Sequence, residues 1–105
     1  MQFDDREKAL EGKYAHDAEL QFKVNARRNK LLGLWAAEQM GLKADAAAQY
    51  AKSVVESDFE RAGDEDVFRK VVADLKAKKI DVSDHRLRKR MDELLQEARK
   101  QLMKE

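Results

Sequence analysis

Residues 31–37, Leu-Leu-Gly-Leu-Trp-Ala-Ala, form the longest nearly unbroken apolar run in the chain and its densest apolar cluster. Gly33 interrupts this run at a cost of about 1 kcal/mol relative to alanine in a helix, and its apolar neighbours can compensate for that cost. The run is far too short to cross a bilayer, which takes about 20 apolar residues. It therefore predicts the buried end of a long first helix.

This first helix is expected to begin near Asp4 or Asp5, because either side chain can cap the free N–H groups of a first turn. It is expected to run to Met40, with Gly41 just past its end, where glycine commonly stops a helix. Gly12 is the other interruption and lacks an apolar cluster around it. The helix should therefore be weakest at Gly12.

Three further helices are predicted from apolar residues that recur at spacings of three and four. The second follows Ala44 or Asp45 and ends at Gly63, where Asp64 caps the third. Ser83 caps the fourth, which has the clearest apolar stripe. The expected core consists of Leu31, Leu34, Trp35, Tyr50, Val54, Phe68, Val72, Leu75, Leu87, Met91, Leu94 and Leu95.

Composition agrees with an all-α chain. Among 105 residues there is no proline and no cysteine, 41% are charged and 43% are hydrophobic. The absence of cysteine excludes disulfides and thiolate metal sites, and no run alternates with period two as strands do. We expect a small four-helix bundle over residues 23–105, with a long first helix whose N-terminal part, residues 1–22, is an extended or flexible arm.

The stretch 3–22, FDDREKALEGKYAHDAELQF, is rich in helix formers but has little to bury. Its large apolar residues are Phe3, Leu10, Tyr14, Leu20 and Phe22. A lone helix of this length is marginal in water, so the arm is either frayed, as termini often are, or waits for a partner. In the second case it is an amphipathic helix that enters a groove on another protein, with Leu10, Tyr14 and Phe22 as anchors.

Charge is balanced overall, at +1, but unevenly distributed. Residues 1–22 carry six acids against three bases. The two basic clusters are Arg27, Arg28 and Lys30, and Arg86, Arg88, Lys89 and Arg90. One alternative is therefore a nucleotide- or nucleic-acid-binding module that uses these clusters. The near-neutral total and the lack of a recognition-helix signature favour ion pairs between helices or with another protein, so no nucleic acid and no direct membrane contact are expected.

The residues that catalysis or metal binding would need are sparse. His16 and His85 lie far apart, and His16 with Glu19, one helical turn away, could hold a metal only if another helix completed the site. No glycine opens a phosphate-binding loop. We therefore expect no enzyme, no cofactor and no metal. The N-terminus is acidic and no apolar stretch follows it, so no secretory signal is expected either.

Several stretches together resemble one known family. They are FDDRE at 3–7, A-H-D-x-E at 15–19, ARRNKLLGLWAAE at 26–38, GDEDVFRK at 63–70 and the basic amphipathic C-terminal helix. In this order they are similar to the zeta subunit of alphaproteobacterial F-type ATP synthases, over nearly the whole chain. The resemblance implies a four-helix regulatory protein that inhibits ATP hydrolysis by the rotary catalytic head.

By this resemblance the arm is the inhibitory element, a helix inserted between a catalytic subunit, its non-catalytic neighbour and the central stalk. Such a wedge blocks the opening and closing that accompany rotation. The protein is expected to be cytoplasmic, peripherally associated with the inner membrane through the ATP synthase, and monomeric when free. The matching positions are Phe3, Asp4, Asp5, Arg6, Glu7, Ala15, His16, Asp17 and Glu19, to which Leu10, Tyr14 and Phe22 add apolar anchors.

Overall fold

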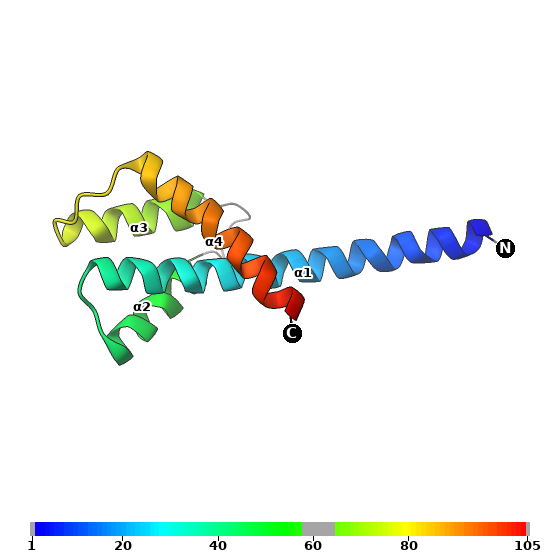
Figure 1. Ribbon diagram of the computed structural model, residues 1–105, viewed down its shortest axis with the longest axis horizontal. Helices are drawn as coiled ribbons and strands as arrows, with labels where there is room; N and C mark the ends of the chain where they lie inside the picture. Colours follow the sequence, from blue (N-terminus) through cyan, green and yellow to red (C-terminus); the bar gives the residue numbers. More distant parts are fainter. Residues whose placement is uncertain (1, 58–64, 105) are drawn as a thin grey trace.

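Four helices make up the computed structural model, which describes residues 2–57 and 65–104, with the backbone alone for residues 2–18. They are α1 (Gln2–Gln39), α2 (Ala44–Glu56), α3 (Glu65–Ala77) and α4 (Asp84–Lys104). Within these ranges no residue belongs to a strand. The predicted all-α bundle with a long first helix is confirmed (Figure 1).

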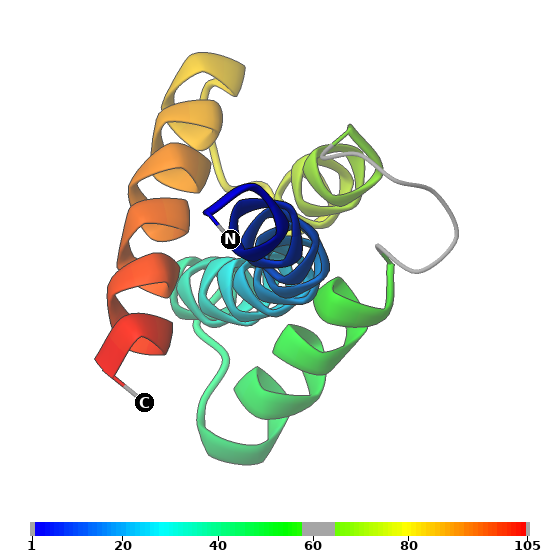
Figure 2. The same ribbon diagram turned by 90° about the vertical axis from the view of Figure 1, so that its right-hand side faces the viewer.

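Helix α1 is the axis of the molecule. Figure 2 shows α2, α3 and α4 around α1, and each of the three contacts it. At 1.5 Å per residue the 38 residues of α1 span about 57 Å, close to the 62 Å longest dimension of the molecule. Because the other helices are much shorter, the first half of α1 projects beyond them (Figure 1).

Two predicted helix ends have the expected geometry. At the end of α1, Gly41 adopts a left-handed φ of 76°. Its N–H donates to the carbonyl of Glu38 at 3.1 Å, and the N–H of Leu42 donates to that of Ala37 at 2.8 Å. These paired bonds satisfy carbonyls that the helix leaves free. At the start of α4 the Ser83 hydroxyl accepts the N–H of Arg86 at 3.1 Å, which is the predicted cap.

Other helix ends differ by a few residues. Helix α1 already includes Gln2, ahead of the expected start, and ends one residue before Met40. Helix α2 was expected to follow Ala44 or Asp45 but already includes both, and the side chain of the preceding Lys43 makes no capping bond. The predicted end of α2 at Gly63 and the cap at Asp64 lie outside the described residues.

The buried core overlaps the predicted one only in part. It consists of Leu32, Ala36, Val54, Val67, Phe68, Val71, Leu75, Leu87 and Met91. Trp35, Tyr50, Val72 and Leu94 are half-buried against it, and Leu31 and Leu95 are half-buried. The prediction for Leu34 is wrong, because its side chain is 37% exposed whereas Leu32 is fully buried.

Gly33 lies at a close approach of α1 and α2. A Cβ atom added there would lie 2.5 Å from the Cα of Ala51 and 3.2 Å from Cγ2 of Val54. Because the first of these is a backbone atom of a packed helix, it cannot rotate away. The glycine is therefore required by the crossing of the two helices, and this offsets its low helix propensity.

The exchange Gly33→Ala should lower the free energy of unfolding by about 2 kcal/mol, because overpacking at the crossing outweighs the gain of about 1 kcal/mol in helix propensity. Urea denaturation followed by circular dichroism measures the change. The matched control is Gly12→Ala, the same exchange in the part of α1 that precedes the bundle, and it should not destabilise the fold. A Gly33→Ala protein as stable as the wild type would contradict the close approach.

Tyr50 links α2 to α3. Its hydroxyl donates to Oδ2 of Asp74 at 2.8 Å, and the Lys70 ammonium lies 3.1 Å from the same oxygen and 5.4 Å from the centre of the Tyr50 ring. Burial, the hydrogen bond and the negative charge of Asp74 together raise the pKa of Tyr50 well above its ordinary 10.0. The phenol therefore keeps its proton in the folded state when an unfolded tyrosine would lose it.

We expect Tyr50→Phe to cost about 1 kcal/mol of stability near neutral pH, through loss of this hydrogen bond. Above the ordinary pKa of 10.0 the unfolded wild-type chain releases the Tyr50 proton and the folded chain does not, so wild-type stability falls as pH rises. The difference between wild type and variant should therefore shrink between neutral pH and about pH 11. Unfolding free energies from urea titrations at both pH values test this, and an unchanged difference would contradict it.

Candidate functional site

The last turn of the predicted arm is the first part of α1 whose side chains are described. Glu19 and Gln21 are exposed, and the Gln21 amide donates to Oδ1 of Asn25 at 3.1 Å along the helix surface. Phe22 is 62% exposed, which is unusual for an aromatic side chain. Among the described side chains, the first buried one along the chain is Val24, at 2%. An exposed phenylalanine thus lies immediately outside the bundle.

Most of the predicted partner-binding residues lie outside the residues whose side chains are described, although their backbone belongs to α1. These residues are Phe3, Asp4, Asp5, Arg6, Glu7, Leu10, Tyr14, Ala15, His16 and Asp17. Of the others, Glu19 and Phe22 are exposed and lie about one helical turn apart. Their role in binding a partner stays a prediction.

The first basic cluster is divided between the surface and the interior. Arg28 is only 1% exposed, and its Nε donates to Oδ1 of the equally buried Asn29 at 2.6 Å. Arg27 is half-buried and donates to Oε1 of Gln101 in α4 at 2.9 Å. Lys30 alone of the cluster is fully at the surface. Since Arg28 cannot reach a phosphate, this cluster does not form the contiguous patch that nucleic-acid binding requires.

The second basic cluster, in α4, partly serves the fold. The Arg88 guanidinium lies 3.9 Å from the centre of the Phe68 ring and 3.0 Å from a carboxylate oxygen of Glu65. It joins α4 to α3, and its side chain covers the edge of the core. Arg90 pairs with Glu93 at 3.3 Å. Ion pairs within the bundle, the favoured use of these charges, are therefore present.

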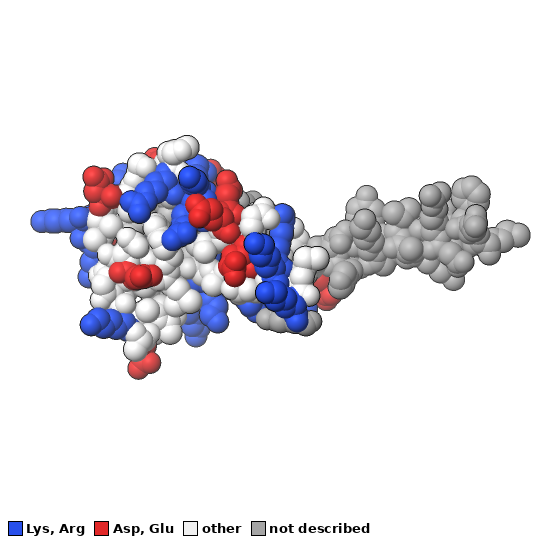
Figure 3. Space-filling view, viewed as in Figure 1, with Lys and Arg blue, Asp and Glu red and all other residues white. Residues whose placement is uncertain are grey.

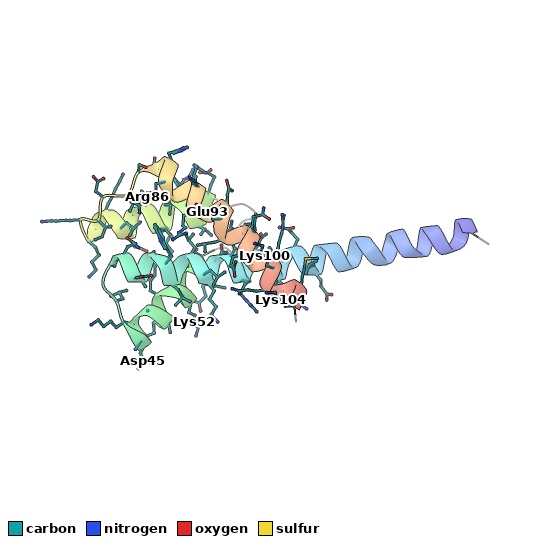
Figure 4. All side chains as sticks on the ribbon, viewed as in Figure 1. Asp45, Lys52, Arg86, Glu93, Lys100 and Lys104 are labelled. Carbon is teal, nitrogen blue, oxygen red and sulfur yellow. The ribbon has the colours of Figure 1, made fainter. Side chains whose placement is uncertain are left out.

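Arg86 and Lys89, the other basic residues of this cluster, border a shallow pocket of about 270 Å³. Its lining residues are Trp35, Arg86, Lys89, Arg90 and Glu93. The Arg90 guanidinium lies 5.6 Å from the centre of the Trp35 ring. In Figure 4, Arg86 and Glu93 extend from the first half of α4. A half-buried indole beside several bases can accommodate a flat ring that carries negative charge.

A second hollow, of about 430 Å³, lies where α1 enters the bundle. We call it the base groove, and its lining residues are Phe22, Lys23, Ala26, Arg27, Lys30, Val55 and Leu102. Figure 3 shows basic side chains on the end of α4 beside the same part of α1, and Figure 4 identifies Lys100 and Lys104 among them. Sequence reasoning missed this groove, because Val55 and Leu102 are distant from Phe22 in the sequence.

The described side chains contain no cluster of three or more histidines, cysteines and carboxylates that could hold a metal ion. His85 is exposed in the first turn of α4, and His16 lies outside the described side chains. Among the described residues no helix has the length and apolar character needed to cross a membrane.

Comparison with known proteins gives the family. A chain solved by solution NMR is 48% identical, with a TM-score of 0.72, over 81% of this chain and 96% of the other. No curated protein matches. The family model of ATPase inhibitor subunit zeta matches residues 1–101. This chain therefore belongs to the ATPase inhibitor subunit zeta family, a family of inhibitory regulators of the ATP synthase.

Proposed function

We propose that this protein inhibits ATP hydrolysis by inserting residues 1–22, the N-terminal part of α1, into the catalytic head of the F-type ATP synthase. The insertion site is the interface of a catalytic subunit with its non-catalytic neighbour, against the central stalk. The observation that carries this proposal is that α1 continues past the bundle as a helix and exposes 62% of Phe22 at the junction. Family membership supports the inhibitory role.

The continuity of α1 favours insertion energetically. Starting a new helix is unfavourable, whereas extending an existing one adds a hydrogen bond for each residue fixed. Because the bundle holds α1 from Val24 onward, the arm begins from a helix that already exists. Part of the ordering cost of binding is thereby met in the free protein, which raises affinity.

The length of the arm suits a wedge. Residues 2–22 extend about 30 Å as a helix, enough to reach from the outside of a protein interface to its interior. The bundle is wider than the arm and remains outside, where it limits how far α1 enters. The inserted helix prevents the interface from opening and closing, so hydrolysis stops without any reaction at the inhibitor. The free protein is monomeric and acts on the cytoplasmic side, where the head lies.

Removal of residues 1–19 should abolish inhibition of ATP hydrolysis by purified F-type ATPase from the same organism, while full-length protein inhibits. The truncated chain keeps every described buried residue, so its circular dichroism and thermal midpoint should report an intact bundle. Steady-state ATPase assays over a range of inhibitor concentrations measure the effect. Inhibition by the truncated protein at the same concentration as the full chain would contradict an arm-based mechanism.

A second candidate function is nucleotide binding, which one observation favours. The pocket beside Trp35 combines an aromatic face with Arg86 and Lys89 at the surface. Nucleobases stack on aromatic side chains, and the side chains of arginine and lysine bind phosphates. Because Arg88 contacts Glu65 and Phe68, the remaining basic side chains are too few to bind a long nucleic acid but enough to bind one nucleotide.

If this pocket binds a nucleotide, ADP should bind the wild-type chain in calorimetry, and Arg86→Gln with Lys89→Gln should weaken binding about tenfold. The matched control is Lys43→Gln with Lys52→Gln, which removes two positive charges from α2 and the residue before it, and α2 does not contact α4 among the described residues. The control should bind as the wild type does. Equal affinities for all three proteins would place the nucleotide elsewhere, and undetectable binding to the wild type would eliminate this function.

A further inference from the structure

The base groove marks one side of α1 that the bundle leaves uncovered. Helices α2 and α4 flank α1 and do not contact each other among the described residues, and Figure 2 shows them on separate sides of it. Val55 of α2 and Leu102 of α4 form the two walls, while Phe22 and Ala26 of α1 contribute the floor. The groove therefore has the walls and the apolar floor that helix packing requires.

Exposed apolar side chains also occur at the groove. Among the described residues the exposed large hydrophobic side chains are Phe22, Leu34 and Met103. Phe22 lines the groove, and Met103 follows Leu102 at the far wall and is 82% exposed. Leu34 lies twelve residues after Phe22, about 120° away around the helix axis, so it is not part of this surface. An exposed phenylalanine that lines a groove is typical of an interaction site.

The rim of the groove is basic, and part of its positive charge is not neutralised by ion pairs. Lys23 and Lys30 are exposed and, within the described part of the chain, neither forms an ion pair. Arg27, between them, bonds to Gln101 and adds its positive charge to the rim. No acidic residue occurs in α1 between Lys23 and Ala37. An apolar floor with a basic rim is complementary to an acidic amphipathic helix.

We propose that the base groove docks an acidic amphipathic helix of the ATPase head, presented on the outer surface beside the interface that the arm enters. This inference rests on the proposed function. The location supports it, because the groove begins at Phe22, where the arm ends, so a partner that surrounds the arm meets the groove next. Apolar side chains of the partner helix pack against Phe22 and Val55, and its carboxylates face Lys23 and Lys30.

Docking at the groove makes attachment bivalent. The arm and the groove lie on one continuous helix, so binding at either one holds the other at a high local concentration of its own target. The arm alone blocks rotation, and the groove lowers the concentration at which blocking occurs. Loss of groove binding should therefore change the half-inhibitory concentration and leave maximal inhibition intact.

The test reverses the rim charges in the full-length chain. Lys23→Glu with Lys30→Glu should raise the half-inhibitory concentration for ATP hydrolysis about tenfold or more, with the same residual activity at saturation. Lys76→Glu with Lys78→Glu is the matched control, because it makes the same change in net charge on exposed residues that do not line the groove. It should inhibit as the wild type does. Circular dichroism confirms that both variants are folded.

The outcomes separate this inference from the function on which it rests. Equal half-inhibitory concentrations for the wild type, the groove variant and the control overturn groove docking alone. Failure of the wild type to inhibit overturns the proposed function, and groove docking with it. A photoreactive residue at Ala26 gives a second measurement, because it should crosslink to a subunit of the head. Crosslinks only to another copy of this chain would assign the groove to self-association and overturn the proposal.

Discussion

One helix, α1, is both the central element of the bundle and the helix that continues into the arm. The positions of the other helices and of the arm all depend on it. Helices α2, α3 and α4 all pack against it. Its backbone hydrogen bonds run without a break from Gln2 to Gln39, so the arm has no linker of its own. A flexible linker would let an arm sample many directions, whereas here each contact that orients α1 in the bundle also orients the arm. The close approach of Gly33 to Ala51 and the left-handed stop at Gly41 fix the far end of this helix.

The end of the bundle nearest the arm is held by polar contacts as well as by apolar packing. Arg28 and Asn29 are both 1% exposed and joined at 2.6 Å, and Arg27 bonds to Gln101 of α4. Burying a charged group is costly unless its hydrogen bonds are made. Apolar contacts tolerate small rotations and shifts of one helix along another, whereas hydrogen bonds specify distance and direction. The bond between Arg27 and Gln101 therefore helps to set which residue of α4 lies opposite α1 at the junction, and so where the walls of the base groove stand.

Local sequence signals predicted the number of helices and several of their ends, because capping depends on few residues. Ser83 and Gly41 show this, each acting within one turn of its own position. The burial of side chains was harder to predict, because the size of an apolar side chain does not decide whether it lies in the core. Leu34 is as large and apolar as Leu32, and only the positions of α2 and α4 decide that one is exposed and the other buried. A helix packed on several sides has no single apolar face, so the 3.6-residue period loses its meaning along α1.

The same reasoning explains which parts of the functional surface were visible in the sequence. The arm was predictable because a shortage of apolar residues over 3–22 is a property of one continuous segment. The base groove was not, because its walls come from Val55 and Leu102, which are distant from Phe22 in the sequence. The burial of Arg28 was equally hidden, since the sequence places it within a run of surface-like bases.

The arm and the open side of the bundle are two consequences of the same arrangement of helices. A fifth helix packed between α2 and α4 would cover Phe22 and Ala26, and it would also bury the point from which the arm extends. Leaving that side open sacrifices some apolar burial. Exposed apolar surface at the root of the arm is then desolvated only when a partner encloses the helix. Burial of the Phe22 side chain, which contributes little to folding, thus contributes to binding, at the position where the arm and its target must first meet.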